Sequence, residues 1–221
     1  MMNRSALLLG ASGLVGGECL TALLAEESFD RVHALVRRTL ALDHPKLIQH
    51  PTSFDDLEST STVWSSDAVF CCLGTTIKKV GSQEAFRKVD HGYPLAAARH
   101  AASNKAGVFL LISALGANVG SPVFYNRIKG ETERDLKKLD LRRLVILRPS
   151  LILGERKESR AGEMIARAFM EPLSALMVGG LRRYRPIHAR TIGCAMVKMS
   201  VAETIGTTTL ESEQIEALGK E

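Results

Sequence analysis

The sequence predicts an α/β protein whose parallel sheet is doubly wound and covered by helices on both faces. Three observations predict this fold class: short apolar runs alternate with longer amphipathic segments, a glycine-rich turn follows the first apolar run, and no repeat of about 20 to 50 residues is visible. The 221 residues, 45% of them hydrophobic and 24% charged, suffice for a core that needs no metal or disulfide.

Six apolar runs are predicted as strands because they are short and are bounded by turn-forming or polar residues. They cover residues 5–10, 31–36, 46–50, 67–72, 107–112 and 143–148. Helices are predicted between them, each opened by small or polar residues that can cap a first turn. They cover residues 14–26, 54–60, 83–103 and 122–139, the last starting at Ser121-Pro122.

The alternation stops after Pro149, which divides the chain into residues 1–150 and a small C-terminal lobe, 151–221, packed on the same domain. Residues 154–190 carry helical pieces and a cluster of three arginines near their end. Arg182, Arg183 and Arg185 either bind an anionic substrate group or form a solvated loop. The chain closes with a helix near 191–203, a short apolar run at 208–210 and a helix at 212–218, which we expect to return to the sheet.

Charge and composition exclude several partners. The net charge of +5 is a small excess, and 5% aromatic residues are too few for a nucleic-acid stacking surface. No apolar stretch approaches the roughly 18 residues of a membrane span, and the N-terminus shows no secretory cleavage site, so a cytoplasmic protein is expected. The four cysteines lack metal-binding spacing, so we expect reduced thiols and no metal site.

A glycine-rich turn joins the first strand to the first helix. Gly10, Gly13 and Gly16 form a G-x-x-G-x-x-G pattern. Glycines permit a tight turn and a close approach to a pyrophosphate, whose charge then rests on free N–H groups at the helix start. A plain strand-to-helix turn is the alternative. The position between a strand and a helix favours a dinucleotide site, so residues 1–150 are predicted as a Rossmann-like domain.

Two arginines follow the second strand, where NAD-binding proteins usually present an acidic residue to the ribose 2′-hydroxyl. Arg37 and Arg38 stand there instead. A guanidinium can bind a 2′-phosphate through two charge-assisted hydrogen bonds, so NADP(H) is the predicted cofactor. The alternative is a solvated basic loop.

A tyrosine, a lysine and a serine are the candidate catalytic residues. Tyr125 and Lys129 stand four residues apart on one face of a predicted helix. A neighbouring ammonium favours the ionised form of a phenol, which can then exchange a proton with a carbonyl or alcohol oxygen. Ser113 follows the fifth strand, where its hydroxyl could hold the same oxygen. An exposed lysine, a packed tyrosine and a loop serine are the structural alternatives.

Taken together, these stretches resemble the short-chain dehydrogenase/reductase superfamily in its atypical branch, and more closely the Tat-interacting-protein-like oxidoreductases. The resemblance spans most of the chain. It is carried by residues 10–16, 67–76, Val89-Asp90, Ser113, 125–129, 147–154 and 158–163. It implies an NADP(H)-dependent Rossmann fold. Relatives place an asparagine near the lysine to order a water, whereas this chain has Asp90, a carboxylate that can accept the same bonds but adds charge.

The resemblance also implies the cofactor contacts. These are Gly10, Ser12, Gly13, Leu14, Val15 and Gly16 at the pyrophosphate, Arg37 and Arg38 at the 2′-phosphate, Ser53 and Phe54 at the adenine, Leu73, Gly74 and Thr75 along the ribose, Tyr125 and Lys129 at the nicotinamide ribose, and Pro149 at the nicotinamide pocket.

Two functions stay open at this point. The first is an NADPH-dependent oxidoreductase acting on a small-molecule carbonyl or alcohol through Ser113, Tyr125 and Lys129. The second is an NADP(H)-sensing regulatory protein that binds a protein partner with little catalysis. The intact serine, tyrosine and lysine favour catalysis. The expected assembly is a monomer or a homodimer.

Overall fold

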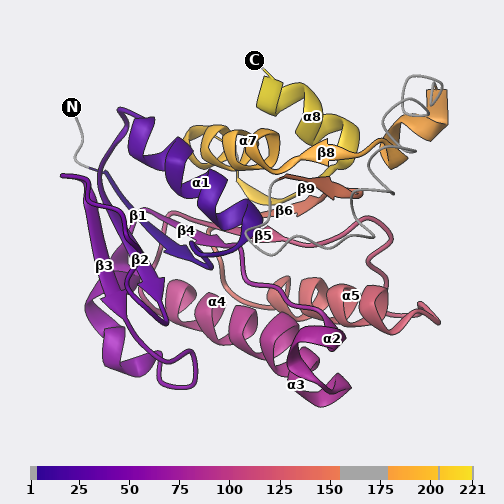
Figure 1. Cartoon of the computed structure of the whole chain (residues 1–221), viewed down its shortest axis with the longest axis horizontal. Coiled ribbons are helices and arrows are strands. Elements are labelled where there is room, and N and C mark those ends of the chain that lie inside the picture. The colour runs from indigo at the N-terminus through magenta and orange to yellow at the C-terminus, as the bar shows by residue number, and fades with distance from the viewer. Residues whose placement is uncertain (1–3, 155–178, 204, 221) are drawn as a thin grey trace.

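A seven-stranded, fully parallel sheet forms the centre of the protein, in the order β3-β2-β1-β4-β5-β6-β9 (Figure 1). The computed structural model describes residues 4–154, 179–203 and 205–220. The strands are β1 (Arg4–Leu9), β2 (Phe29–Val36), β3 (Leu47–Pro51), β4 (Ala68–Cys71), β5 (Val108–Ile112), β6 (Arg143–Arg148) and β9 (Gly206–Glu211). The predicted fold class is confirmed.

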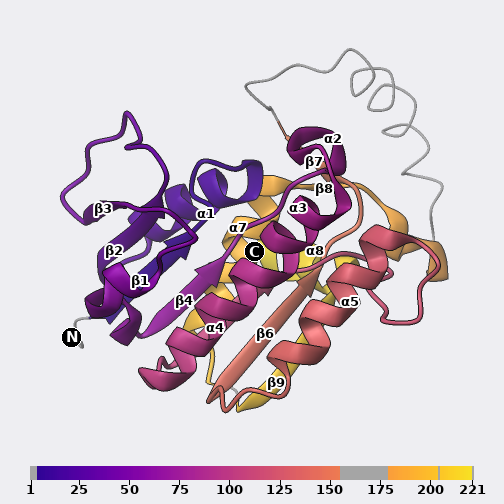
Figure 2. The same ribbon diagram turned by 90° about the horizontal axis from the view of Figure 1, so that it is seen from below.

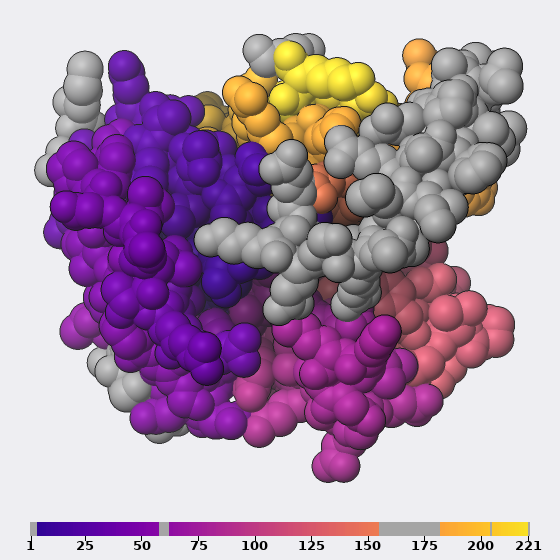
Figure 3. All heavy atoms as spheres, viewed as in Figure 1, coloured from indigo at the N-terminus to yellow at the C-terminus, as the bar shows by residue number. Residues whose placement is uncertain are grey.

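Helices cover both faces of this sheet (Figures 1 and 2). One face carries α1 (Leu14–Ala25), α7 (Ala189–Val201) and α8 (Ser212–Lys220), and α7 packs against both of the others. The other face carries α2 (Ile77–Val80), α3 (Gln83–Arg87), α4 (Tyr93–Ser103) and α5 (Phe124–Leu136). In Figure 3 the first three strands and their loops form one side of the molecule, and α5 lies toward the opposite side.

The core has two halves, one on each face of the sheet. Leu8 and Phe70 belong to the half under α1 and α7, whereas Leu7 and Val69 belong to the half under α4. All four side chains are fully buried. Because both faces are covered, the strands need apolar residues at consecutive positions, which is why they appear in the sequence as short continuous apolar runs.

The predicted helix over residues 54–60 is wrong. The chain turns at Phe54 and Asp55, and a 3₁₀ helix runs over Glu58–Ser65. The hydroxyl oxygen of Ser53 accepts a hydrogen bond from the Asp55 N–H, a local bond that competes with helix initiation. The buried Trp64 indole donates to the Leu57 carbonyl oxygen and joins the second core half.

Two helix predictions need smaller corrections. The helix expected over 83–103 contains a π-helical segment, Lys88–Gly92, between α3 and α4. The helix expected from Pro122 begins at Phe124, because the Ser121 hydroxyl oxygen accepts the Val123 N–H in a local turn rather than capping the helix.

The end of the chain returns to the sheet, as expected. β9 extends further than the predicted run at 208–210 and pairs in parallel with β6. A separate two-stranded ladder joins β7 (Ile152–Leu153) and β8 (Ile187–His188). The lobe expected at 154–190 and the motif at 158–163 lie largely outside the described residues, and the division at residue 150 stays a prediction.

The pairing of β2 with β3 brings two imidazoles together. His33 Nδ1 lies 2.9 Å from His50 Nε2, and burial lowers the pKa of both rings, with the charge of His50 adding to the effect on His33. A histidine with a lowered pKa binds fewer protons in the folded state than in the unfolded state. Stability is therefore complete above the unfolded value near 6.5 and decreases as the pH falls through it.

We expect the melting temperature to fall between pH 7.5 and pH 5.5, and the His50→Gln variant to reduce that fall. A reduction of about 2 °C or more corresponds to about 1 kcal/mol in a chain of this size. Thermal unfolding at both pH values measures it, with His188→Gln as the control because His188 is exposed. An equal fall in wild type and His50→Gln would exclude this pair as the source.

Candidate dinucleotide and catalytic site

The predicted site residues follow the carboxyl ends of six strands. Because all the strands are parallel, these ends lie along one edge of the sheet. Gly10 follows β1, Arg37 follows β2, Ser53 is near the end of β3, Leu73 is near the end of β4, Ser113 follows β5 and Pro149 follows β6. The strand order reverses direction between β1 and β4, which is where doubly wound sheets bind ligands.

The turn after β1 requires glycine at two positions. Gly10 has a φ of +88°, and a Cβ there would lie 2.6 Å from the Cys72 carbonyl oxygen. A Cβ on Gly16 would lie 2.0 Å from the Gly10 carbonyl oxygen. The Gly13 N–H donates to that same oxygen at 2.9 Å, and Gly13 precedes the first residue of α1.

The start of α1 can therefore hold an anion. Ser12 and Gly13 are exposed, and the helix begins at Leu14 with no acidic residue in its first turn. The first N–H groups of a helix have no carbonyl partner within the helix and carry its positive dipole end. A pyrophosphate fits these donors and the close backbone approach that the glycines permit.

Arg37 and Arg38 are exposed directly after β2, and neither forms an ion pair within the described part of the chain. β1 pairs with β2, and the last paired residues are Leu9 and Leu35. The arginines therefore leave the sheet next to the glycine turn that follows β1. Their guanidinium groups are available for an external anion.

The predicted adenine contacts lie after β3. Ser53 is exposed, and the Phe54 ring packs on the Tyr93 ring with centroids 5.7 Å apart. The Tyr93 hydroxyl and the Lys88 ammonium both contact the Asp55 carboxylate. These contacts hold Phe54 against Tyr93, the first residue of α4.

Lys129 is buried in the structure and paired with Asp90. Its Nζ lies 2.8 Å from Asp90 Oδ1, and the two residues are 4% and 1% exposed. Burial alone would lower the pKa of Lys129, but the charges of Asp90 and Tyr125 and the hydrogen bond to Asp90 together raise the pKa above its ordinary value. Asp90 Oδ2 also accepts the Thr75 N–H at 2.8 Å. Asp90 thereby joins the lysine to the loop predicted to line the ribose.

The π-helical segment delivers Asp90 to this position. An extra residue in a helical turn shifts the side chains that follow and leaves a carbonyl without its usual helical donor. The single Thr132 hydroxyl proton is shared between the Ile128 carbonyl oxygen at 2.8 Å and the Asp90 carbonyl oxygen at 3.0 Å, so α5 contacts the widened turn. A Cβ on Gly74 would approach both Asp90 Oδ1 and Lys129 Nζ, at 3.6 and 3.9 Å.

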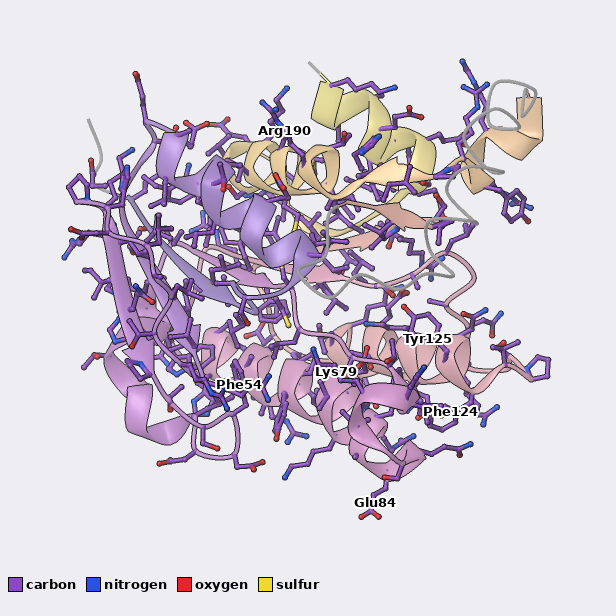
Figure 4. All side chains as sticks on the ribbon, viewed as in Figure 1. Phe54, Lys79, Glu84, Phe124, Tyr125 and Arg190 are labelled. Carbon is purple, nitrogen blue, oxygen red and sulfur yellow. The ribbon has the colours of Figure 1, made fainter. Side chains whose placement is uncertain are left out.

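Tyr125 lies on the exposed end of this arrangement. Its side chain is 40% exposed, and Lys129 Nζ lies 5.9 Å from its ring centroid. The Phe86 ring packs against it and against Phe124. Figure 4 shows Tyr125 and Phe124 at the beginning of α5, on the opposite side of the sheet from Arg190. The structure brings Tyr125 and Lys129 together, with the phenol accessible and the ammonium enclosed.

The Ser113 hydroxyl is held by a residue that the sequence analysis missed. Ser113 Oγ donates to Glu133 Oε1 at 2.5 Å, and Glu133 accepts two hydrogen bonds from Arg148. The hydrogen bond to Glu133 raises the pKa of Arg148, which also pairs with Glu211 on β9. Glu133 continues the four-residue spacing of Tyr125 and Lys129 along α5, and that spacing was the available signal.

The remaining predicted residues have these positions. Leu73 is buried and Gly74 is exposed after β4, whereas Pro149 is buried and its carbonyl oxygen accepts the Leu115 N–H. Arg182 and Arg183 are exposed, so their role stays open.

Cys71 is fully buried, and burial raises the pKa of its thiol to about 12, as in an unreactive core residue. No helix in the described ranges is long and apolar enough to cross a membrane.

Solved structures share this fold. The Bordetella bronchiseptica enzyme WbmH in complex with NAD+ covers 98% of this chain and 79% of its own, with a TM-score of 0.69 and 16% identity. The human epimerase family protein SDR39U1 with NADPH covers 94% and 74%, with a TM-score of 0.62 and 18% identity. These likenesses show the fold, a seven-stranded parallel sheet flanked by helices of the Rossmann-like type.

Relatives with higher identity show the family of the chain, although no family model matches it. Protein HTATIP2 of Rattus norvegicus is 33% identical over 100% of this chain and 91% of its own. Mitochondrial protein FMP52 of Candida albicans is 36% identical over 86% and 84%, and that of Aspergillus fumigatus 35% over 96% and 93%. The chain belongs to the HTATIP2/FMP52 family, and these relatives are consistent with the atypical branch of the short-chain dehydrogenase/reductase superfamily.

The expected cytoplasmic location is wrong. The fungal relatives are named as mitochondrial proteins, which points to mitochondria instead. An apolar leader with a cleavage site marks secretion, whereas mitochondrial targeting depends on other sequence features, so secretory signals do not bear on this location.

Proposed function

We propose that the protein is an NADPH-dependent oxidoreductase that interconverts a small-molecule carbonyl and the corresponding alcohol. The observation that carries the proposal is the arrangement of Tyr125, Lys129 and Asp90 at the same sheet edge as the glycine turn. Membership in the HTATIP2/FMP52 family supports the coarser class, an NAD(P)-binding oxidoreductase-like protein. The mitochondrial names of the fungal relatives support activity in mitochondria.

In this proposal each side chain of the site has a separate role. When bound, the nicotinamide supplies or takes the hydride. Tyr125 exchanges a proton with the substrate oxygen, because its phenol is exposed beside a fixed cation. Lys129 lies beside that phenol's ring and can contact the ribose, while Asp90 holds the ammonium in place.

Arg37 and Arg38 provide the preference for NADPH in this proposal. They are exposed beside the glycine turn and have no anionic partner among the described residues. Each charge-assisted hydrogen bond to the 2′-phosphate contributes about 1.5 to 3 kcal/mol. We therefore expect NADPH to bind more tightly than NADH, which lacks this phosphate.

The experiment is a titration of the purified protein with NADPH and with NADH, followed by nucleotide fluorescence. The double variant Arg37→Ala, Arg38→Ala is expected to weaken NADPH binding on the order of 100-fold and to leave NADH binding within about threefold. Arg31→Ala is the matched control, because Arg31 is exposed near the opposite end of β2. Equal affinity of the wild type for both nucleotides would contradict the NADPH preference, and binding of neither would refute the function.

A further inference from the structure

We propose that Asp90 sets the balance between the oxidised and the reduced cofactor, because its carboxylate cancels the charge of the Lys129 ammonium where the nicotinamide ribose is expected. This inference rests on the proposed function and deepens it by naming the residue that controls which form of the cofactor binds more tightly. An oxidised nicotinamide ring carries a positive charge, whereas a reduced ring is neutral. A fixed protein charge beside the ring therefore favours one form over the other.

Asp90 and Lys129 form an enclosed ion pair. Lys129 Nζ lies 2.8 Å from Asp90 Oδ1, and Lys129 and Asp90 are 4% and 1% exposed. Charges that water and salt do not reach are weakly screened, so each of them acts over a longer distance than a surface charge does. If one member of the pair lost its charge, the charge of the other would act on a ligand nearby.

The pair has no net charge in the folded protein. Burial lowers the pKa of Lys129, but its neighbours, Asp90 foremost, raise the pKa above its ordinary value, so the ammonium stays protonated at neutral pH. The Cys71 thiol also lies near this pair, and burial raises its pKa to about 12, so the thiol stays neutral. Glu133, one helical turn further along α5, is balanced by Arg148.

Gly74 brings a ligand close to the pair. Gly74 is exposed after β4, and a Cβ there would lie 3.6 Å from Asp90 Oδ1 and 3.9 Å from Lys129 Nζ. The following N–H group, that of Thr75, donates to Asp90 Oδ2 at 2.8 Å. A nicotinamide ribose at Gly74 and Thr75, as in the proposed function, therefore lies next to both charges. Removal of the carboxylate charge would leave the ammonium uncompensated there.

The experiment measures the affinity of both cofactor forms by calorimetry at pH 7.5, without a substrate. The readout is the dissociation constant for NADP+ divided by that for NADPH. In Asp90→Asn we expect this ratio to rise about tenfold, because the unbalanced ammonium repels the charged ring and not the neutral one. A purely structural role of Asp90 would weaken the binding of both nucleotides alike and leave the ratio unchanged.

Lys129→Met is the second variant and decides the test if Asp90→Asn fails to fold. It leaves the carboxylate unbalanced instead, so we expect the ratio to fall about tenfold. Glu84→Gln is the control, because it removes the same charge from an exposed side chain that points away from the sheet (Figure 4). We expect its ratio to match the wild type.

The inference is overturned if the ratio in the deciding variant stays within twofold of the wild type or moves in the opposite direction. An equal shift in Glu84→Gln would overturn it as well, since the effect would then not belong to the buried pair. Failure of the wild type to bind either nucleotide would instead refute the proposed function, so the two failures are distinguishable.

Discussion

Tyr125→Phe is expected to bind NADPH with the wild-type affinity and to lose carbonyl turnover by about 10²- to 10⁴-fold, the usual contribution of a positioned acid or base. The phenyl ring can keep its packing against Phe86, so only the hydroxyl is removed. The loss should appear in kcat, because proton exchange with the substrate oxygen occurs in the transition state.

The measurement is NADPH oxidation in the presence of a panel of aldehydes and ketones, alongside a cofactor titration. Tyr184→Phe is the control, since Tyr184 is also about half exposed and its hydroxyl bonds only to Arg183 among the described residues. Turnover by Tyr125→Phe within threefold of the wild type would remove Tyr125 from the reaction.

Gly16→Ala has the second large expected effect, a loss of NADPH affinity of more than 100-fold or a loss of the folded state. Its Cβ would lie 2.0 Å from the Gly10 carbonyl oxygen and 3.1 Å from the Ala11 nitrogen. No rotamer can relieve a clash with backbone, so the turn has to open and its N–H groups leave their positions.

Gly17→Ala is a closely matched control. A Cβ there would meet the Ala11 carbonyl oxygen at 3.6 Å, an ordinary contact, and alanine favours a helix over glycine by about 1 kcal/mol. We expect Gly17→Ala to melt at or above the wild-type temperature and to bind NADPH normally. Thermal unfolding and the nucleotide titration test both variants, and wild-type affinity in Gly16→Ala would contradict the assigned turn.

The sheet could be predicted from the sequence because its signals are local. Each buried strand is a short apolar run, and the six predicted strands agree with the structure within about two residues at each end. The failures had both local and nonlocal causes. The Ser53 and Ser121 hydroxyl oxygens accept nearby N–H groups and displace two predicted helix starts. The buried Trp64 lies in the 3₁₀ helix Glu58–Ser65, where its indole donates to the Leu57 carbonyl oxygen. Asp90 contacts Thr132 from a π-helical segment that no periodicity in the sequence indicates.

The candidate site was predictable to the extent that it depends on strand ends and helical spacing. Glycines after β1 and the four-residue step from Tyr125 to Lys129 are visible in the chain. The hydrogen-bond partners of buried polar groups cannot be identified from the sequence. Glu133 looks like a solvated helix residue until β5 and β6 bring Ser113 and Arg148 to it.

A crystal structure of the protein with NADPH tests the central claim most directly, because it locates each part of the cofactor against the chain. The predicted result has the pyrophosphate at the N–H groups of Gly13 to Val15, the 2′-phosphate between Arg37 and Arg38, and the nicotinamide ribose at Tyr125 and Lys129. A nucleotide bound elsewhere, or one whose nicotinamide ring lies away from Tyr125, would contradict the proposed oxidoreductase.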